Sequence, residues 1–350
     1  MSTGNVPTKR CIVADIIKVA EKAGVSKSTV SRVLNNGYVA PETRERIEQV
    51  MRELDYRPSS FAQNIRTRRS HEIAMMIPDL TNSFFTQMYR AVEDVMLRNG
   101  YLVVLCETRQ RIDNEIRYAE TLMRRNIDGL LYFTQQKEKK NQEYFVSLSA
   151  KIPVIFMDYA FADIEGIDCI GVKGREITAE AVEMLFRTGK RRIAYMNTPK
   201  KNNITMVRYY GYRDGLKACG LPEDKSRVIL PAVHAGNSLI DAGYTAARKL
   251  LEQCPDTDAI MTASDQLAVG VIKYLDEKKI QIPEKVAVVG FDDIDLCQVI
   301  SPKLSTIRQP IREMGEAAAK RLLKRIQSDE KAGKKILFEG QLILRESTGQ

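Results

Sequence analysis

Residues 24–35 read GVSKSTVSRVLN, and this stretch decides how the first part of the chain folds. Its apolar residues recur at helical spacing, which predicts a helix with one buried face: Val25, Val30, Val33 and Leu34. The remaining positions hold small hydroxyl residues and the cations Lys27 and Arg32. A core helix would favour Ala or Leu at those positions, and a purely solvated face would more often carry Glu–Lys pairs. The exposed face is therefore suited to contact a polar, negatively charged partner.

The flanking residues extend this stretch to three short helices. Asp15 can cap a first helix over residues 16–23, and Ser26 can cap the second helix, from Lys27 to about Leu34. Gly24 supplies the backbone freedom for a sharp turn, and Ala20 is small enough to let two helices cross closely. A third helix begins at Pro41, and its apolar residues close the core: Ile47, Val50, Met51 and Leu54. This is the pattern of a helix-turn-helix, whose second helix lies in the DNA major groove.

The second helix provides the predicted contacts with DNA. Arg32 can donate twice to a guanine, and Lys27 and Ser28 can reach base edges or phosphates. The same interface is predicted to include Thr29, Ser31, Asn35 and Tyr56. An ordinary solvated helix would also expose charges, but the cap, the glycine, the small-residue spacing and the charge all agree with DNA binding.

The charge of the chain is concentrated at the same end. Residues 1–70 hold thirteen Lys and Arg against seven Asp and Glu, a net charge of +6 out of +9 for all 350 residues. A basic head on a nearly neutral body indicates that contact with a polyanion is confined to one end.

The composition, with 44% hydrophobic and 28% charged residues, is that of a soluble protein with two or three globular units. No run approaches the roughly 18 apolar residues of a membrane span, and the first residues lack the pattern of a signal peptide. We therefore expect a cytoplasmic protein without a membrane contact. The six cysteines are far apart and only two histidines accompany them, so we expect reduced buried thiols and no metal site.

The sequence contains no pattern that predicts an enzyme. No GxGxxG or GxSxG motif is present, and residues 166–173, GIDCIGVK, fall short of a phosphate-binding loop. We expect neither catalysis nor a cofactor. A solute-binding or sensing protein without operator control is the alternative, and it fits the body but not the basic head.

Beyond residue 71, short apolar runs alternate with amphipathic stretches. The runs EIAMMI, YLVVLC, DGLLYF and PVIFM are typical of buried parallel strands, and so are RRIAYMN, RVIL, DAIMTA and KVAVVG further along. Helices are predicted between them, over about 84–99, 114–125 and 139–150 in the first series. The predicted fold class is therefore α/β, with two doubly wound lobes in tandem after the helical head.

Several motifs together resemble the lactose-repressor (LacI/GalR) family of bacterial transcription regulators. They are GVSKSTVSRVLN, PETRERI, LDYRPSSFAQNIRTRRS, IPDLTNSFF, VVGFDD and LSTIRQP, and the resemblance extends from about Asp15 to Thr348. It implies a DNA-binding domain over 1–57, a hinge helix over 58–70, and an effector-binding and dimerisation domain over 71–350 that resembles periplasmic binding proteins. It also implies a homodimer on a pseudo-palindromic operator, with repression as the family norm.

The resemblance assigns a role to the segment before the body. Ile65 stands where family members insert a leucine into the minor groove, and Arg66 would hold a phosphate. A charged linker without its own structure is the alternative when DNA is absent.

Ligands of open α/β sheets bind beyond the carboxyl ends of the strands. The candidates at such positions are Asp79, Phe84, Asp158, Asn202, Arg208, Asp265 and Asp292. The resemblance implies that Arg208 and Asp292 bind polar groups of an effector. For a lone carboxylate such as Asp265, helix capping is an equally good explanation.

Two departures from the family leave the effector open. Many sugar-responsive members have an aromatic residue in place of Ser238 and an asparagine in place of Ser264. A sugar, a sugar phosphate, a nucleobase, a protein partner or no effector all stay possible, and so do induction and corepression.

Finally, the family topology implies that the chain crosses between the lobes near 158–163, near Asp292 and near the C-terminus.

Overall fold

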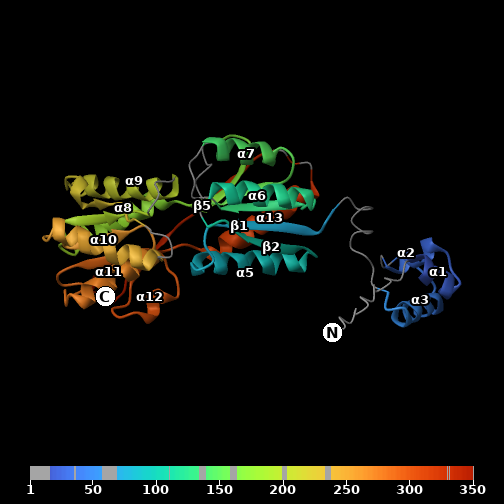
Figure 1. The fold of residues 1–350 in the computed structure, drawn as a ribbon. Coiled ribbons are helices and arrows are strands. Elements are labelled where there is room, and N and C mark those ends of the chain that lie inside the picture. The colour runs from blue at the N-terminus through green and yellow to red at the C-terminus, as the bar shows by residue number, and fades with distance from the viewer. Residues whose placement is uncertain are drawn as a thin grey trace, which may run out of the picture. The chain divides into compact units, whose positions relative to one another are not determined.

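A computed structural model of the chain describes residues 16–34, 37–56, 69–109, 111–133, 139–157, 164–198, 203–232, 238–328, 330 and 332–349. The chain separates into two compact units, a head (Met1–Ser70) and a body (His71–Gln350) (Figure 1). Nearly all of the predicted hinge, 58–70, lies outside the described residues, as do several predicted positions: Asp15, Asn35, Ile65, Arg66, Asp158 and Asn202.

The head contains the three predicted helices, α1 (Ile16–Ala23), α2 (Lys27–Leu34) and α3 (Pro41–Glu53). Each helix contributes one side chain with no exposed surface to the common core: Val19, Val30 and Ile47. Gly24 has φ +67°, so the turn between α1 and α2 uses the left-handed backbone region expected of it. The predicted helix-turn-helix is therefore confirmed.

The first lobe of the body is a six-stranded sheet in the order β11-β5-β4-β3-β1-β2, in which every described pairing is parallel. Its inner strands are buried apolar runs, because helices cover both faces of a parallel sheet. The elements are β1 (Glu72–Ile77), α5 (Ser83–Arg98), β2 (Leu102–Glu107), α6 (Ile112–Arg124), β3 (Gly129–Phe133), α7 (Lys139–Ser149), β4 (Val154–Met157), β5 (Asp168–Val172), α13 (Ile311–Gln327) and β11 (Lys335–Phe338).

The second lobe is a six-stranded sheet in the order β12-β10-β9-β8-β6-β7, parallel except for the edge strand β12. The two predicted doubly wound lobes are thus confirmed. The elements are α8 (Gly174–Arg187), β6 (Ile193–Met196), α9 (Asn203–Ala218), η2 (Lys225–Arg227), β7 (Val228–Ile229), α10 (Leu239–Gln253), β8 (Ala259–Thr262), α11 (Asp265–Glu277), β9 (Ala287–Asp292), α12 (Leu296–Val299), β10 (Ser305–Arg308), β12 (Gln341–Ile343) and η3 (Glu346–Thr348).

Two of the three expected crossings between the lobes are wrong. β5 pairs with β4 in the first lobe, so the chain leaves this lobe after Val172 rather than at 158–163. Similarly, β10 pairs with β9 in the second lobe, so the chain returns at Gln309 and Pro310 rather than near Asp292. In each case the chain adds one more parallel strand to the sheet, β5 or β10, before it crosses to the other lobe. The third crossing, between β11 and β12, is near the C-terminus as expected.

All three crossings follow the carboxyl end of a strand, namely β5, β10 or β11. Two of them lie side by side, because the Lys173 N–H donates to the Phe338 carbonyl at 2.9 Å. At Gly340 a Cβ atom would lie 3.1 Å from the Ile177 side chain and 3.3 Å from that of Ile307. The crossings therefore form one closely packed connection at the edge where ligands of such sheets bind.

A buried ion pair holds α13 in the first lobe after the second crossing. Asp168, at the start of β5, is 2% exposed and accepts a hydrogen bond from Arg321 Nε at 2.5 Å. Arg325 Nη1 lies 3.4 Å from the other carboxylate oxygen. Since an unpaired charge would be costly there, these groups fix the position of α13 against β5.

Glycines allow the helices of the second lobe to touch through their backbones. A Cβ atom on Gly270 in α11 would lie 2.1 Å from the Ile240 carbonyl oxygen of α10, and one on Gly243 would lie 2.2 Å from the Leu267 carbonyl oxygen. Such separations are far below van der Waals contact, so neither position accommodates a larger residue without moving a helix.

We predict that Gly270→Ala lowers the free energy of unfolding by about 2 kcal/mol, because backbone atoms cannot yield to the new methyl group. The loss should appear even though alanine favours a helix over glycine by about 1 kcal/mol. Denaturant unfolding of the full chain measures it. Gly174→Ala is the matched control, since its Cβ would lie 3.6 Å from the nearest atom. Equal stability of the two variants would contradict this account of the packing.

Candidate functional site

The cap of α2 is formed as the sequence predicts. The Thr29 N–H donates to Ser26 Oγ at 3.2 Å. The Ser26 hydroxyl also lies 2.7 Å from the Ser28 hydroxyl and 2.8 Å from that of Thr29. Three hydroxyl groups therefore gather at the first turn of the helix, where backbone N–H groups and the helix dipole favour an anion.

The side chains proposed to contact DNA have different exposures. Lys27, Ser28 and Arg32 are exposed, whereas Thr29 and Ser31 are half-buried. Because Val30 and Val33 on the opposite side are buried in the head core, α2 presents its charged side chains on the surface. The structure thus leaves the cations available to a polyanion.

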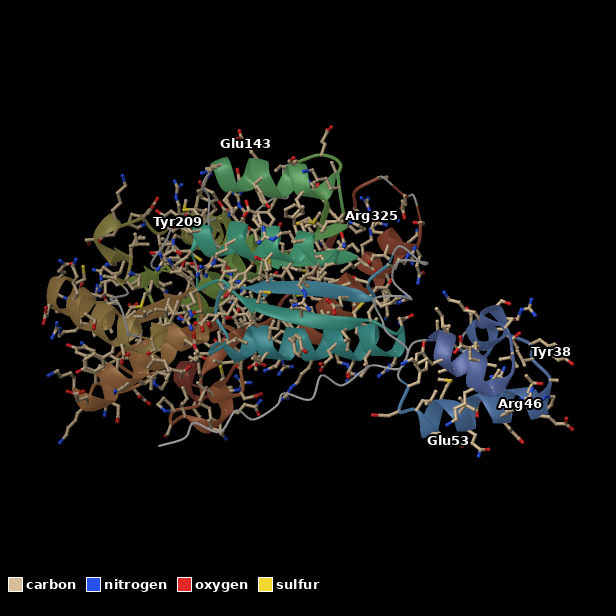
Figure 2. The ribbon with its side chains drawn as sticks, turned by 45° about the vertical axis from the view of Figure 1, so that its right-hand side comes forward. Tyr38, Arg46, Glu53, Glu143, Tyr209 and Arg325 are labelled. Carbon is tan, nitrogen blue, oxygen red and sulfur yellow. The ribbon has the colours of Figure 1, made fainter. Side chains whose placement is uncertain are left out.

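Tyr56 and Tyr38 occupy contrasting environments in the head. Tyr56, one of the predicted contacts, is half-buried and packs against the head core. Tyr38, in the segment between α2 and α3, is 92% exposed and points into solvent (Figure 2). Arg44 Nη2 donates to the Gly37 carbonyl at 2.8 Å and fixes the backbone beside it. Tyr38 is not among the DNA contacts predicted from the sequence. An aromatic residue directly after the second helix is nevertheless a feature from which such a contact could have been predicted.

In the body, Arg208 and Asp292 lie together in the second lobe, and both are buried. Arg208 Nη1 donates to the Ala263 carbonyl at 2.5 Å, and its guanidinium carbon lies 3.6 Å from the centre of the Phe291 ring. Arg208 Nη2 is 3.9 Å from Asp292 Oδ1, which is too long for a direct hydrogen bond. Asp292 Oδ1 instead accepts one from Gln309 Nε2 at 2.7 Å. Arg208 and Asp292 therefore form an ion pair without a direct hydrogen bond between them.

Through Asp292 and Gln309, the Arg208–Asp292 ion pair is linked to one of the crossings between the lobes. Asp292 ends β9 with φ +123°, a strained conformation for a residue other than glycine. Gln309 is 3% exposed and belongs to the second crossing between the lobes. Sequence reasoning missed Gln309, because only the strand order shows that the crossing passes here.

Asp265 makes structural contacts inside the second lobe, and its predicted contact with an effector stays a prediction. Its side chain has no exposed surface, and it accepts hydrogen bonds from the Thr306 hydroxyl at 2.5 Å and the Ile294 N–H at 2.9 Å. A Cβ atom on Gly290 would lie only 2.1 Å from Asp265 Oδ1. Burial raises the pKa of this carboxyl. With both oxygens engaged inside the lobe, Asp265 joins β9 and β10 to α11.

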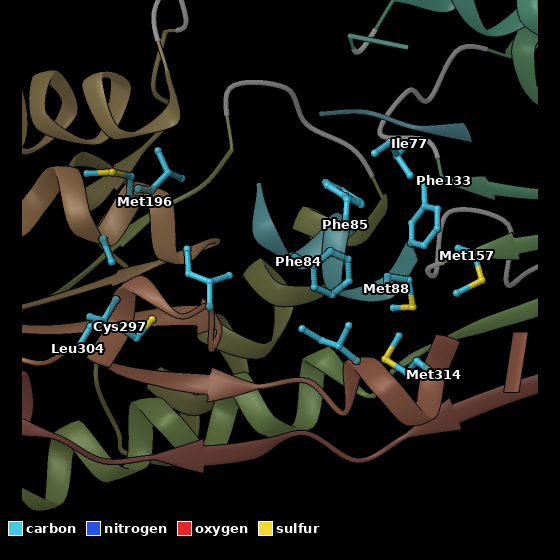
Figure 3. Packing of buried hydrophobic residues seen from close by; sticks show 14 of the residues in the cluster. Ile77, Phe84, Phe85, Met88, Phe133, Met157, Met196, Cys297, Leu304 and Met314 are labelled. Carbon is cyan, nitrogen blue, oxygen red and sulfur yellow. The ribbon is translucent and has the colours of Figure 1, made fainter. Parts of the chain in front are cut away.

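The predicted residues of the first lobe follow β1. Asp79 is half-buried, and its Oδ1 accepts from the Thr81 N–H at 2.8 Å and the Thr81 hydroxyl at 2.7 Å. Phe84 is 6% exposed and lies edge to face against Phe85, with ring centroids 5.1 Å apart (Figure 3). It belongs to a buried cluster with members in both lobes. Asp79 thus shapes the turn before α5, and Phe84 packs in the apolar interior.

A polar contact joins the lobes at the start of α11. Gln266 Nε2 lies 3.4 Å from the Thr81 carbonyl of the first lobe. Among the described residues, Gln266 Oε1 and the nearby Ser264 Oγ are buried without a hydrogen-bond partner. Ser238, the other departure from the family, forms a capping box with Asp241 at the start of α10. Ser238 therefore has a structural use, whereas Ser264 and Gln266 keep an unmet capacity for hydrogen bonds.

Two negative findings apply to the described part of the chain. No group of three or more His, Cys, Asp or Glu side chains there is arranged to hold a metal ion. None of its helices combines the length and the apolar character needed to cross a bilayer.

A helix-turn-helix head followed by two parallel-sheet lobes defines a ligand-responsive DNA-binding regulator. Comparison with known families supports this class, since residues 15–59 match the model described as bacterial regulatory proteins, lacI family, and residues 182–348 match the periplasmic binding protein-like domain. The chain belongs to the LacI family of transcriptional regulators.

Relatives match the chain over nearly its whole length. The ribose operon repressor of Halalkalibacterium halodurans is 33% identical over 331 residues, which cover 94% of this chain and 96% of the relative. The HTH-type transcriptional repressor CytR of Escherichia coli is 28% identical, with 97% of this chain and 98% of the relative covered. These relatives are repressors and not enzymes.

Solved structures show the same architecture. The lac repressor dimer bound to operator and the anti-inducer ONPF is 25% identical, with a TM-score of 0.85 over 96% of this chain and 99% of that one. A LacI-family regulator from Enterococcus faecium with bound ribose is 28% identical, with a TM-score of 0.69 over 79% of this chain and 98% of that one.

We predict that Ser26→Ala destabilises α2 by about 0.5–2 kcal/mol, because the Thr29 N–H loses its capping acceptor. Hydrogen exchange on the full chain measures the effect as faster exchange of the α2 amides, with the body unchanged. Ser26→Asp is the matched control, since aspartate is an equally good cap. If exchange in α2 were the same in all three proteins, the cap would have no energetic role.

Proposed function

We propose that this regulator is a repressor that acts in the cytoplasm, where it binds a pseudo-palindromic operator as a homodimer. The observation that carries this proposal is the capped helix α2, which buries its valines and exposes Lys27 and Arg32 on a basic head. The lac repressor structure with operator is a dimer, which supports two heads reading two half-sites.

Within this proposal, Arg32 reads a guanine, and Lys27 and Ser28 contact base edges or phosphates. Tyr38 is added to the interface, since an exposed aromatic ring next to the recognition helix can pack against the DNA. Residues 1–57 form the DNA-binding domain, 58–70 the hinge with its Ile65 wedge and Arg66 phosphate contact, and 71–350 the effector-binding and dimerisation domain.

The effector is proposed to be a small polyhydroxylated compound that binds between the lobes. Arg208 supplies charge-assisted hydrogen bonds, and Asp292 and Gln266 supply acceptors for hydroxyl groups. Two relatives support this class, namely the ribose operon repressor and the regulator with bound ribose. Asp79, Phe84, Asp158 and Asn202 are proposed to border the same site.

The coupling of effector to DNA is proposed to pass through Gln309. A ligand that engages Asp292 competes with or reinforces the 2.7 Å hydrogen bond from Gln309, which lies in a crossing between the lobes. Effector binding thereby favours one arrangement of the lobes, and the two hinge segments of the dimer respond.

We predict that Arg32→Ala weakens operator binding by about 1–3 kcal/mol, because two hydrogen bonds to a guanine are lost. The operator is first selected from random duplexes, and affinities for it and for unrelated DNA are then measured at several salt concentrations.

Arg46→Ala is the matched control, since Arg46 is also exposed on the head but lies on α3 (Figure 2). It should leave the preference for operator over unrelated DNA unchanged. An equal loss of affinity for both DNAs on Arg32→Ala would make Arg32 a phosphate contact instead.

We predict that the effector raises the melting temperature of the wild type, and that Arg208→Ala lowers effector affinity at least about tenfold through loss of a charged hydrogen bond. A thermal-shift screen of pentoses, hexoses, sugar phosphates and nucleobases measures this. For each variant, the melting temperature with ligand is compared with that of the same variant without ligand. A variant that is less stable to begin with therefore does not distort the comparison.

Arg213→Ala is the control for the ligand screen, because Arg213 lies on the same helix and pairs with Glu223 on the surface at 2.7 Å. It should keep the full ligand-induced shift. A ligand that stabilises Arg208→Ala as strongly as the wild type binds elsewhere, and this result would contradict the proposed site.

A further inference from the structure

A groove of about 590 Å³ lies in the second lobe, between the carboxyl ends of α10 and α11 and the segment that leads into β9. Arg208 and Asp292 do not line it. β9 begins at Ala287 near this groove and ends at Asp292 beside Arg208. A strand of that length spans roughly 17 Å, so the groove and the interlobe site are on opposite edges of the sheet.

The floor of the groove is apolar. Leu251 comes from α10, Tyr274 from α11, and Ile280 and Val286 from the segment between α11 and β9. Tyr274 is 6% and Val286 1% exposed, so both are anchored in the core of the lobe. The volume of the groove is within the range of sites that bind small organic molecules.

The rim of the groove is cationic. Lys278, Lys279 and Lys285 line it and are exposed, against the single carboxylate of Glu252. In the described part of the chain, no hydrogen bond or ion pair involves the side-chain amino group of any of these three lysines. The carboxyl end of α11 accounts for cations at Lys278 and Lys279. It does not account for Lys285, which comes from another segment and adds its charge to the same rim.

We propose that this groove is a binding site for a small amphipathic anion, that is, an apolar body with a carboxylate or phosphate group. The body would cover Tyr274 and Ile280, and the acidic group would lie among the three lysines, where its charge is complemented. The proposal does not depend on the interlobe effector, and its test needs neither operator DNA nor that effector.

Octanoate is the probe, and octan-1-ol, with the same chain and no charge, is its matched comparison. The chain has no tryptophan, so Gln281→Trp at the exposed edge of the groove provides a single fluorescent reporter in the full-length protein. We expect a saturable change of its fluorescence with octanoate, a much weaker response to octan-1-ol, and a loss of octanoate affinity as salt is raised.

Charge-reversal variants test whether the lysines bind the acidic group of octanoate. In the reporter protein, Lys278→Glu with Lys285→Glu should lower octanoate affinity about tenfold and leave the response to octan-1-ol unchanged. Lys249→Glu is the matched control, since Lys249 is an exposed residue of α10 that does not line the groove, and it should leave octanoate affinity unchanged.

Three results of the binding measurements would overturn the proposal. They are a response to octanoate that does not saturate or does not depend on salt, an equal loss of affinity in the control variant, and a reversal variant that binds as the parent does. A change of sedimentation on octanoate addition would also overturn it, because the groove would then be an interface between copies of the chain. The salt dependence is measured with the lysines intact, so the test stands even if the reversal variant does not fold.

Discussion

The structure of the body depends on one constraint, namely that parallel strands cannot be joined by hairpins. Each lobe therefore needs connections that run over its surface, and the chain leaves each sheet only at the carboxyl end of a strand. Because β5, β10 and β11 all end at the interlobe edge, the three crossings meet there. The same edge holds Asp292, at the end of β9, and Arg208, which lies in α9 beside it. The connection between the lobes and the candidate effector site are thus formed by neighbouring segments of chain.

Under the proposed function, a ligand at this edge would act directly on the contacts between the lobes. Gln309 donates to Asp292 at 2.7 Å from within a crossing, and Gln266 contacts the first lobe at 3.4 Å. A ligand shifts such an equilibrium only by its difference in affinity for the two arrangements, about 1.4 kcal/mol for each tenfold change. Ser264 Oγ and Gln266 Oε1 are buried without a hydrogen-bond partner, so under the proposed function they are groups with which a ligand could form hydrogen bonds in one arrangement.

Local patterns in the sequence predicted most of the fold, whereas the paths between elements were not predictable from them. The helices of the head and the apolar strands follow from spacing, capping and burial, which are properties of neighbouring residues. The crossings depend on which strands pair. The strands 168–172 and 305–308 are not among the predicted strands, and the crossings that follow them are therefore misplaced in the prediction. Asp265 illustrates the same limit for the site. Its position after a strand predicts ligand binding, but its hydrogen bonds to Thr306 and Ile294 come from residues distant in sequence.

The head shows how strongly such distant contacts control function. Helices α1 and α2 have only eight residues each, and isolated helices of that length are not stable in water. Their stability, and the direction in which Arg32 points, come from the shared core of Val19, Val30 and Ile47. A residue in that core therefore influences DNA recognition without touching DNA. Under the proposed function, the specificity of the regulator would therefore depend on the packing of the head as well as on its exposed side chains.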